Sequence, residues 1–191
     1  MSESEILGAR LATIVSLVEK KHPLGRTAVM KLCYFLQTLR NVPLGYRFTL
    51  YSYGPFDPRV LSDISTAETL GGIESKTVLY SGGYGYEISP AANTAFVKAL
   101  GAEFITRNGP DFDWVVQRFG SLGSAELELL STVVYVDREY AQAKARQTKE
   151  GIAEKVQEIK PHFSLSDVLV KVGHLEQQGL LRSLTSAPSR H

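Results

Sequence analysis

The stretch YSYGPFDPRVL, residues 51–61, joins an aromatic extended segment to a helix. Its second half predicts a helix start: the Asp57 carboxylate can accept hydrogen bonds from the exposed amides of a first turn, and Pro58 suits the first helical position because its φ is already fixed. Apolar residues then recur at helical spacing until Gly71-Gly72. The tyrosines and Gly54-Pro55 in the first half are not explained by a helix start alone.

Two helices are predicted before this stretch. In the first, apolar residues follow one stripe, Ser2 and Glu5 have the spacing of a capping box, and Pro23 ends the helix. The second, about Thr27 to Arg40, is apolar on more than one face, so we expect little of it to contact water. Its remaining stripe consists of Lys31, Tyr34 and Gln37.

A β-hairpin is predicted after the third helix. Alternating apolar residues lie on both sides of Ser81-Gly82-Gly83, where glycine permits the positive φ angles of a tight turn. Ser89-Pro90 then has the pattern of a cap for a helix reaching Leu100. The order of three helices followed by a hairpin is typical of a winged-helix module.

The second half of the chain is predicted to be helical after a joint at Gly109-Pro110. Asp111 and Asp113 would lie in the first turn of a short helix, where acidic side chains suit the helix dipole. Three further helices are expected, the first capped by Ser124, the second capped by Thr148 and the third beginning at Ser164.

The predicted fold class is therefore mainly α (α+β), with a helical, winged-helix-like first half that carries a small β-hairpin. This first region, residues 1–108, is expected to pack on a helical region, residues 109–182, as one compact unit. Residues 183–191 have the composition of a disordered tail.

The charge of the chain is near neutral in total but unevenly distributed. The 191 residues carry a net charge of +1, which gives no general attraction to nucleic acid or acidic membranes. Residues 1–60 contain eight basic and four acidic residues, and residues 61–140 contain five basic and eleven acidic ones. The N-terminus lacks the order of a signal peptide, and no apolar run reaches the length of about 18 residues that a membrane helix needs. We therefore expect a cytoplasmic protein without a membrane partner.

No pattern of catalytic or metal-binding residues stands out. Cys33 is the only cysteine and lies in an apolar helical pattern, where a free thiol is usually a small buried apolar group. The four histidines are far apart and do not have metal-ligand spacing. The glycines of SGGYGY fit a hairpin better than a phosphate-binding loop. We expect no enzymatic activity, no cofactor and no metal.

Three segments resemble the YwgA-like proteins and the related Panacea (SocA-like) antitoxin domain. They are GRTAVMKLCYFLQ (25–37), YRFTLYSYGPFDPRVLSDI (46–64) and LGGI (70–73). The positions that match the family pattern are Lys31, Tyr34, Gln37, Tyr53, Gly54, Pro55 and Leu61. The C-terminal segments SAELELLSTVVYV and IAEKVQEIKPHFSLSDVLVKVGHLEQQGLL are also similar to the YwgA type, so the resemblance covers nearly the whole chain.

The resemblance implies a non-enzymatic protein of bacteria, their phages or mobile elements. Such a protein neutralises a toxin by direct contact, or accompanies a toxin–antitoxin or phage-defence operon. One related use is to bind a DNA-modifying toxin in place of its nucleic acid, which the acidic segment 61–140 would favour. The basic first helices differ from what such a mimic would show.

The predicted partner-binding site is a rigid aromatic corner that faces the polar stripe of the second helix. Its residues are Lys31, Tyr34, Gln37, Tyr51, Tyr53, Gly54, Pro55, Phe56 and Arg59. Two interpretations remain open. The aromatic side chains can simply fill a gap in the core, or they can form a groove for a partner protein, since tyrosines are favoured anchors at interfaces.

A winged-helix transcriptional regulator that binds DNA as a homodimer is the alternative function. The helix before the hairpin carries Asp63 and Glu68 against Arg59, and the hairpin offers only Lys76. A protein that neutralises several phosphates is expected to carry more basic residues there. The sequence therefore favours a protein partner over nucleic acid.

Overall fold

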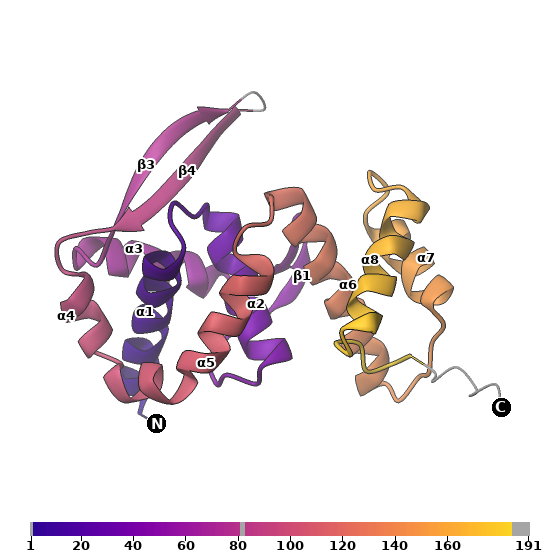
Figure 1. Ribbon diagram of the computed structural model, residues 1–191, viewed down its shortest axis with the longest axis horizontal. Helices are drawn as coiled ribbons and strands as arrows, with labels where there is room; N and C mark the ends of the chain where they lie inside the picture. Colours follow the sequence, from indigo (N-terminus) through magenta and orange to yellow (C-terminus); the bar gives the residue numbers. More distant parts are fainter. Residues whose placement is uncertain (1, 81–82, 185–191) are drawn as a thin grey trace. The chain divides into compact units, whose positions relative to one another are not determined.

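The computed structural model describes residues 2–80 and 83–184, and in them it has eight helices and two small antiparallel hairpins (Figure 1). This confirms the mainly α (α+β) fold class. The chain divides into two units. The first comprises Met1–Thr49 and Phe56–Leu127, and the second comprises Leu50–Pro55 and the described part of Glu128–His191.

The first unit is built around its N-terminal helix. Its helices are α1 (Glu3–Lys20), α2 (Arg26–Leu39), α3 (Pro58–Thr69), α4 (Thr94–Ala99) and α5 (Ala102–Phe119). Helix α1 packs against the other four and against one strand of the hairpin. Small residues permit this: a Cβ on Gly101 would lie 2.8 Å from Ala12 Cβ and 2.9 Å from the Gly8 carbonyl oxygen.

The predicted starts of α1 and α3 are confirmed. Ser2 and Glu5 form the capping box, with the Ser2 side chain accepting from the Glu5 N–H at 3.3 Å. Asp57 is 2% exposed and caps α3 by accepting from the Arg59 N–H at 2.9 Å. Its other oxygen accepts from the Arg47 N–H at 2.5 Å, so the same carboxylate also holds the extended segment before the helix.

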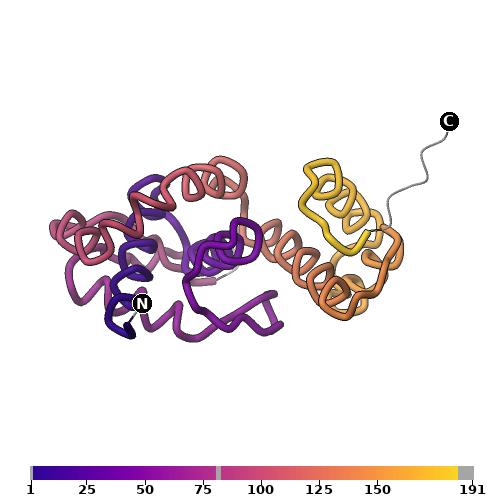
Figure 2. Tube along the Cα trace, turned by 90° about the horizontal axis from the view of Figure 1, so that it is seen from below, coloured from indigo at the N-terminus to yellow at the C-terminus, as the bar shows by residue number. Residues whose placement is uncertain are grey.

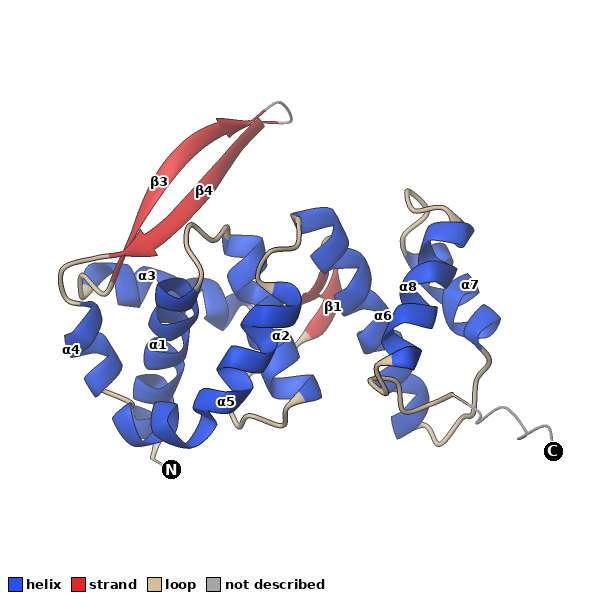
Figure 3. Cartoon of the chain, in the orientation of Figure 1, coloured by secondary structure: helices blue, strands red, loops and turns tan. Residues whose placement is uncertain are grey.

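The predicted hairpin is formed by β3 (Ile73–Tyr80) and β4 (Gly83–Pro90), which project from the helices of the first unit (Figure 3). The predicted turn residues Ser81 and Gly82 lie outside the described residues. The prediction that Ser89-Pro90 caps the next helix is wrong, since both pair with the start of β3 in the ladder. Helix α4 begins only at Thr94.

The predicted joint at Gly109-Pro110 is also wrong, because both residues lie inside α5. An apolar stripe that includes Phe104, Phe112 and Val115 is buried along the whole helix, so packing outweighs the local breaking tendency of the Gly-Pro pair. Asp111 and Asp113 accordingly do not lie in a first turn.

The second unit contains most of α6 (Ser124–Gln142), with α7 (Lys149–Ile159) and α8 (Leu165–Gln177). Helices α7 and α8 pack against each other (Figure 2). The predicted caps are confirmed: the Thr148 side chain accepts from the Gly151 N–H at 3.0 Å and the Ser164 side chain accepts from the Asp167 N–H at 3.1 Å. Helix α6 includes Ser124 as its first residue, so its start lies one residue before the position expected from a Ser124 cap.

The segment after α8 is fixed by one buried carboxylate. Asp137 accepts from the Arg182 N–H at 2.9 Å and from the Ser183 N–H at 2.8 Å. Ser183 is buried and Leu184 bridges to Gln147, so the prediction that these two residues belong to a disordered tail is wrong. The rest of that predicted tail, 185–191, lies outside the described residues. Among the helices described, none combines the length and the apolar character needed to cross a membrane.

Replacing Asp57 by asparagine tests the role of its carboxylate. Burial by itself would raise the pKa of Asp57, but hydrogen bonds from Arg59 and from the Arg47 N–H hold it below its ordinary value of 3.8. A depressed folded-state pKa adds stability above the ordinary value, and this contribution is lost as the pH falls through the folded pKa. Asparagine can still cap the helix but loses the charge that Arg59 and the Arg47 N–H bind, so we expect Asp57→Asn to lower the free energy of unfolding at neutral pH by about 1–2 kcal/mol.

The difference between wild type and Asp57→Asn should shrink in denaturant titrations as the pH falls below 3.8. Asp113→Asn is the control, because the Asp113 side chain is 55% exposed. It should change stability by less than about 1 kcal/mol. A difference for Asp57→Asn that stays constant between neutral and acid pH would contradict this account.

Candidate functional site

The aromatic corner is a hairpin with strands β1 (Thr49–Tyr51) and β2 (Gly54–Phe56). Gly54 has a φ of +85°, in the left-handed region that favours glycine. A Cβ there would lie 3.1 Å from the hydroxyl oxygens of both Ser131 and Thr132 on α6. Residue 54 is therefore glycine for two reasons: its backbone conformation and its close approach to α6.

A buried lysine fastens the turn of this hairpin. Lys160, in the connection after α7, is 3% exposed, and its Nζ lies 2.8 Å from Glu128 Oε1 on α6. The same ammonium donates to the Ser52 carbonyl and, at 3.3 Å, to the Tyr51 carbonyl. The Glu128 carboxylate and the two carbonyls together satisfy the Lys160 ammonium, whose positive charge would be costly to bury without partners. The position of the turn is thus fixed through its backbone.

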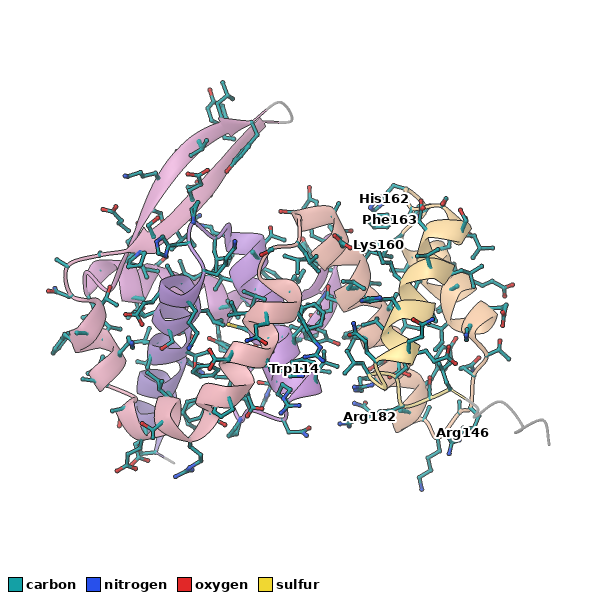
Figure 4. All side chains as sticks on the ribbon, viewed as in Figure 1. Trp114, Arg146, Lys160, His162, Phe163 and Arg182 are labelled. Carbon is teal, nitrogen blue, oxygen red and sulfur yellow. The ribbon has the colours of Figure 1, made fainter. Side chains whose placement is uncertain are left out.

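The tyrosine side chains of this turn point into solvent even though the backbone is held. Tyr51 is 66% exposed and Tyr53 is 71% exposed. His162 lies beside the same anchor, with its Nε2 3.5 Å from Glu128 Oε1 and its side chain 57% exposed. Figure 4 shows His162 and Phe163 next to Lys160, and their two rings lie 4.3 Å apart. We call Tyr51 and Tyr53 the tyrosine corner.

The site residues predicted on α2 have structural roles inside the first unit. Lys31 and Tyr34 are 2% and 3% exposed, so the prediction that their side chains line a surface groove is wrong. The Tyr34 ring packs edge-on against Phe48 at 5.2 Å. The Gln37 side chain donates to the Tyr46 carbonyl and accepts from the Tyr46 N–H, both at 2.9 Å. Tyr34 and Gln37 therefore hold the extended segment that follows α2.

Of the remaining predicted residues, Pro55 is buried, Phe56 is half-buried, and Arg59 takes part in a network inside the first unit. Arg59 Nη2 lies 2.6 Å from Asp57 Oδ2, and the guanidinium lies 5.8 Å from the centre of the Tyr46 ring. The Tyr46 hydroxyl donates to Asp63 Oδ2 at 2.7 Å.

Burial raises the pKa of both Tyr46 and Asp63, so the phenol keeps the proton of this hydrogen bond. Arg10 lies against the same pair, with its Nε 2.9 Å from Asp63 Oδ2. Arg59 is thus one part of a network that joins α1, α3 and the extended segment after α2.

Many of the basic residues of the first unit pair with acidic ones. Lys20 Nζ lies 2.6 Å from Asp113 Oδ1, and Arg40 Nη2 lies 2.7 Å from Asp111 Oδ1. Arg40 and Arg118 also lie 4.9 and 4.2 Å from the centre of the Trp114 ring. Acids from the segment 61–140 therefore neutralise part of the basic first third locally, which disfavours both a phosphate-binding face and an acidic nucleic-acid mimic.

The anchor itself was missed in the sequence. Lys160 and Ser52 are 108 residues apart, and nothing in the local pattern around IKPHF distinguishes a buried lysine from a surface one. In the described residues, no group of three or more His, Cys, Asp or Glu is placed to hold a metal ion.

Removing the anchor charge tests its role. Lys160→Met leaves the Glu128 carboxylate buried without its cation, so we expect the free energy of unfolding to fall by about 3–5 kcal/mol. Amide hydrogen exchange should also become faster at residues 50–55, because the turn loses its donor. The double change Lys160→Met with Glu128→Leu should recover part of the stability.

Lys155→Met is the matched control in the same unit. Its ion pair with Glu158 is exposed, with 43% and 70% of the two side chains accessible. It should therefore change stability by less than about 1 kcal/mol. Equal, small effects of the two lysine substitutions would show that Lys160 is not an anchor.

No protein-family model matches the chain, and no curated protein matches it. The resemblance to the YwgA-like and Panacea families therefore stays a prediction from the quoted residues.

Proposed function

We propose that the chain is a non-enzymatic, cytoplasmic protein-interaction module that binds a partner protein through the tyrosine corner. The observation that carries this proposal is the contrast within this turn: the Tyr51 and Tyr53 side chains are 66% and 71% exposed, while the backbone carbonyls of Tyr51 and Ser52 are anchored by Lys160. Exposed aromatic side chains on a held backbone suit recognition, since little conformational entropy is lost when they become buried at an interface.

The partner that best fits the resemblance is a toxin or a DNA-modifying enzyme that the chain neutralises or adapts. The local pairing of acids and bases in the first unit favours contact through apolar and hydrogen-bonding groups over contact through net charge. Cys33 is fully buried, which raises the pKa of its thiol, and a protonated buried thiol is a poor nucleophile. This disfavours Cys33 as a catalytic nucleophile.

A winged-helix regulator that binds DNA is the second candidate. The order of α1, α2, α3 and the β3–β4 hairpin favours it, since winged-helix proteins present a helix and the following hairpin to DNA. Binding through several phosphates weakens steeply between about 50 and 200 mM salt, whereas an apolar contact does not. A salt titration therefore separates the two candidates.

Alanine substitutions in the tyrosine corner test the proposal. The tagged chain is used to capture partners from nuclease-treated extract of its native host. Tyr51→Ala and Tyr53→Ala should each reduce capture of a stoichiometric partner protein about tenfold or more. Their melting temperatures should stay within about 2 °C of wild type, because both side chains are largely exposed.

Val170→Ala is the control, since Val170 is an apolar side chain of the same unit that is 68% exposed. It should leave capture unchanged. A large loss of thermal stability in the tyrosine variants would indicate that these side chains fill the core. Unchanged capture by stable tyrosine variants, or recovery of nucleic acid alone, would overturn the proposal.

A further inference from the structure

The β3–β4 hairpin carries a second set of exposed apolar side chains, on both of its faces. Cross-strand pairing places Leu79 opposite Tyr84 on one face. Tyr86 lies two residues after Tyr84 on β4, so its side chain is on the same face. Tyr80, one residue after Leu79, lies on the opposite face. We call the set Leu79, Tyr80, Tyr84 and Tyr86 the wing surface.

The wing surface is exposed, although the base of the hairpin is fixed. Leu79, Tyr84 and Tyr86 are 68%, 80% and 40% exposed, and Tyr80 on the other face is 50% exposed. At the base, Ile88 is fully buried, and its N–H donates to the Leu24 carbonyl at 2.8 Å. The hairpin therefore leaves the helices of its unit on an anchored base (Figure 1).

Two of these tyrosines are held in position. The Tyr80 hydroxyl donates to Glu87 Oε1 at 2.9 Å, and its ring covers Gly85, where a Cβ would lie 2.8 Å from a ring carbon. The Arg26 guanidinium stacks over the Tyr86 ring at 3.6 Å. These contacts orient the rings without burying them, as a preformed binding surface requires.

The outer part of the wing surface is uncharged, which indicates the chemistry of its partner. Its four outermost described cross-strand pairs, from Thr77–Tyr86 to Tyr80–Gly83, contain no charged residue. The two charged groups that contact its rings are Glu87, in the next pair toward the base, and Arg26 on α2. Nucleic acid would need basic side chains here to replace its counterions. An uncharged protein surface is the complementary partner, since it would leave no buried charge unpaired.

The exposed area of the wing surface, and its distribution over both faces of the hairpin, indicate the shape of the partner's binding site. The three side chains on one face expose on the order of 400 Å². Two copies pairing through that face would bury roughly 800 Å² in total, below the roughly 1,000 Å² expected of a specific interface, and would leave Tyr80 uncovered. A cleft that receives the hairpin covers both faces at once.

We propose that the wing surface inserts into an uncharged, apolar cleft of the partner protein. This inference rests on the proposed function, since it concerns the same partner, but it uses a different unit of the chain from the tyrosine corner. The wing surface supplies a second, separate contact that increases affinity and specificity for a partner with a cleft of this kind.

Photo-cross-linking from each face of the hairpin tests this inference. The chain carries p-benzoylphenylalanine in place of one residue at a time, as Tyr80→p-benzoylphenylalanine or Tyr84→p-benzoylphenylalanine, in host extract. Phe96→p-benzoylphenylalanine is the control, since Phe96 is an exposed aromatic residue on α4 of the same unit, 58% accessible. We expect both wing positions to cross-link to one and the same protein, and position 96 not to do so.

Cross-links from only one face of the hairpin would overturn the proposal that it inserts into a cleft. Cross-links to a second copy of this chain would also overturn it, because they would show self-association. Retention of a mixed-sequence DNA duplex that is lost in Leu79→Ser with Tyr84→Ser would show a nucleic-acid surface. A partner captured in a Tyr51- and Tyr53-dependent way without cross-links from the wing would refute this inference alone. If the wing cross-links to a protein whose capture does not depend on Tyr51 and Tyr53, only the proposed role of the tyrosine corner is refuted.

Discussion

The second unit and its candidate site depend on the ion pair and hydrogen bonds of the Lys160 ammonium. One buried cation neutralises Glu128 on α6 and donates to two carbonyls of the β1–β2 turn. A charge in this position is tolerated only when all its acceptors are in place, so the contact either forms completely or costs several kcal/mol. This explains how a turn with two solvent-exposed tyrosines can keep a fixed backbone. The proposed recognition by the tyrosine corner and the stability of the second unit are consequently linked through the Lys160 side chain.

Local chemistry made much of the fold predictable. The caps at Ser2, Asp57, Thr148 and Ser164 each depend on residues within a few positions, and all four are confirmed. The Gly109-Pro110 pair led to a wrong prediction for the same reason. Glycine and proline locally favour the end of a helix, whereas the buried apolar stripe of α5 continues past them. Residue type and spacing cannot reveal which elements cover a helix.

The predictions for the candidate site also depended on whether a residue's contacts are local in the sequence. The sequence identified Tyr51, Tyr53 and Gly54 because turn residues and aromatic side chains have local signatures. It placed Lys31 and Tyr34 on a groove, since a helix that is apolar nearly all round gives no sign of which face is covered, and both are buried. Lys160 could not be found at all, because its acceptors are distant in the chain. Both proposed contact surfaces are consequently short, local hairpins, while the elements that hold them are remote in sequence.

The discontinuous second unit also limits how the protein can be divided. The chain leaves the first unit after Thr49, contributes Leu50–Pro55 to the second and returns at Phe56. A fragment beginning at Glu128 would therefore carry Lys160 without the carbonyls that it binds, and a fragment ending at Leu127 would carry a hairpin without α6 beneath Gly54. Neither fragment corresponds to a folding unit. A truncation or fusion point within α6 would therefore separate contacts of the second unit, whichever fragment is kept.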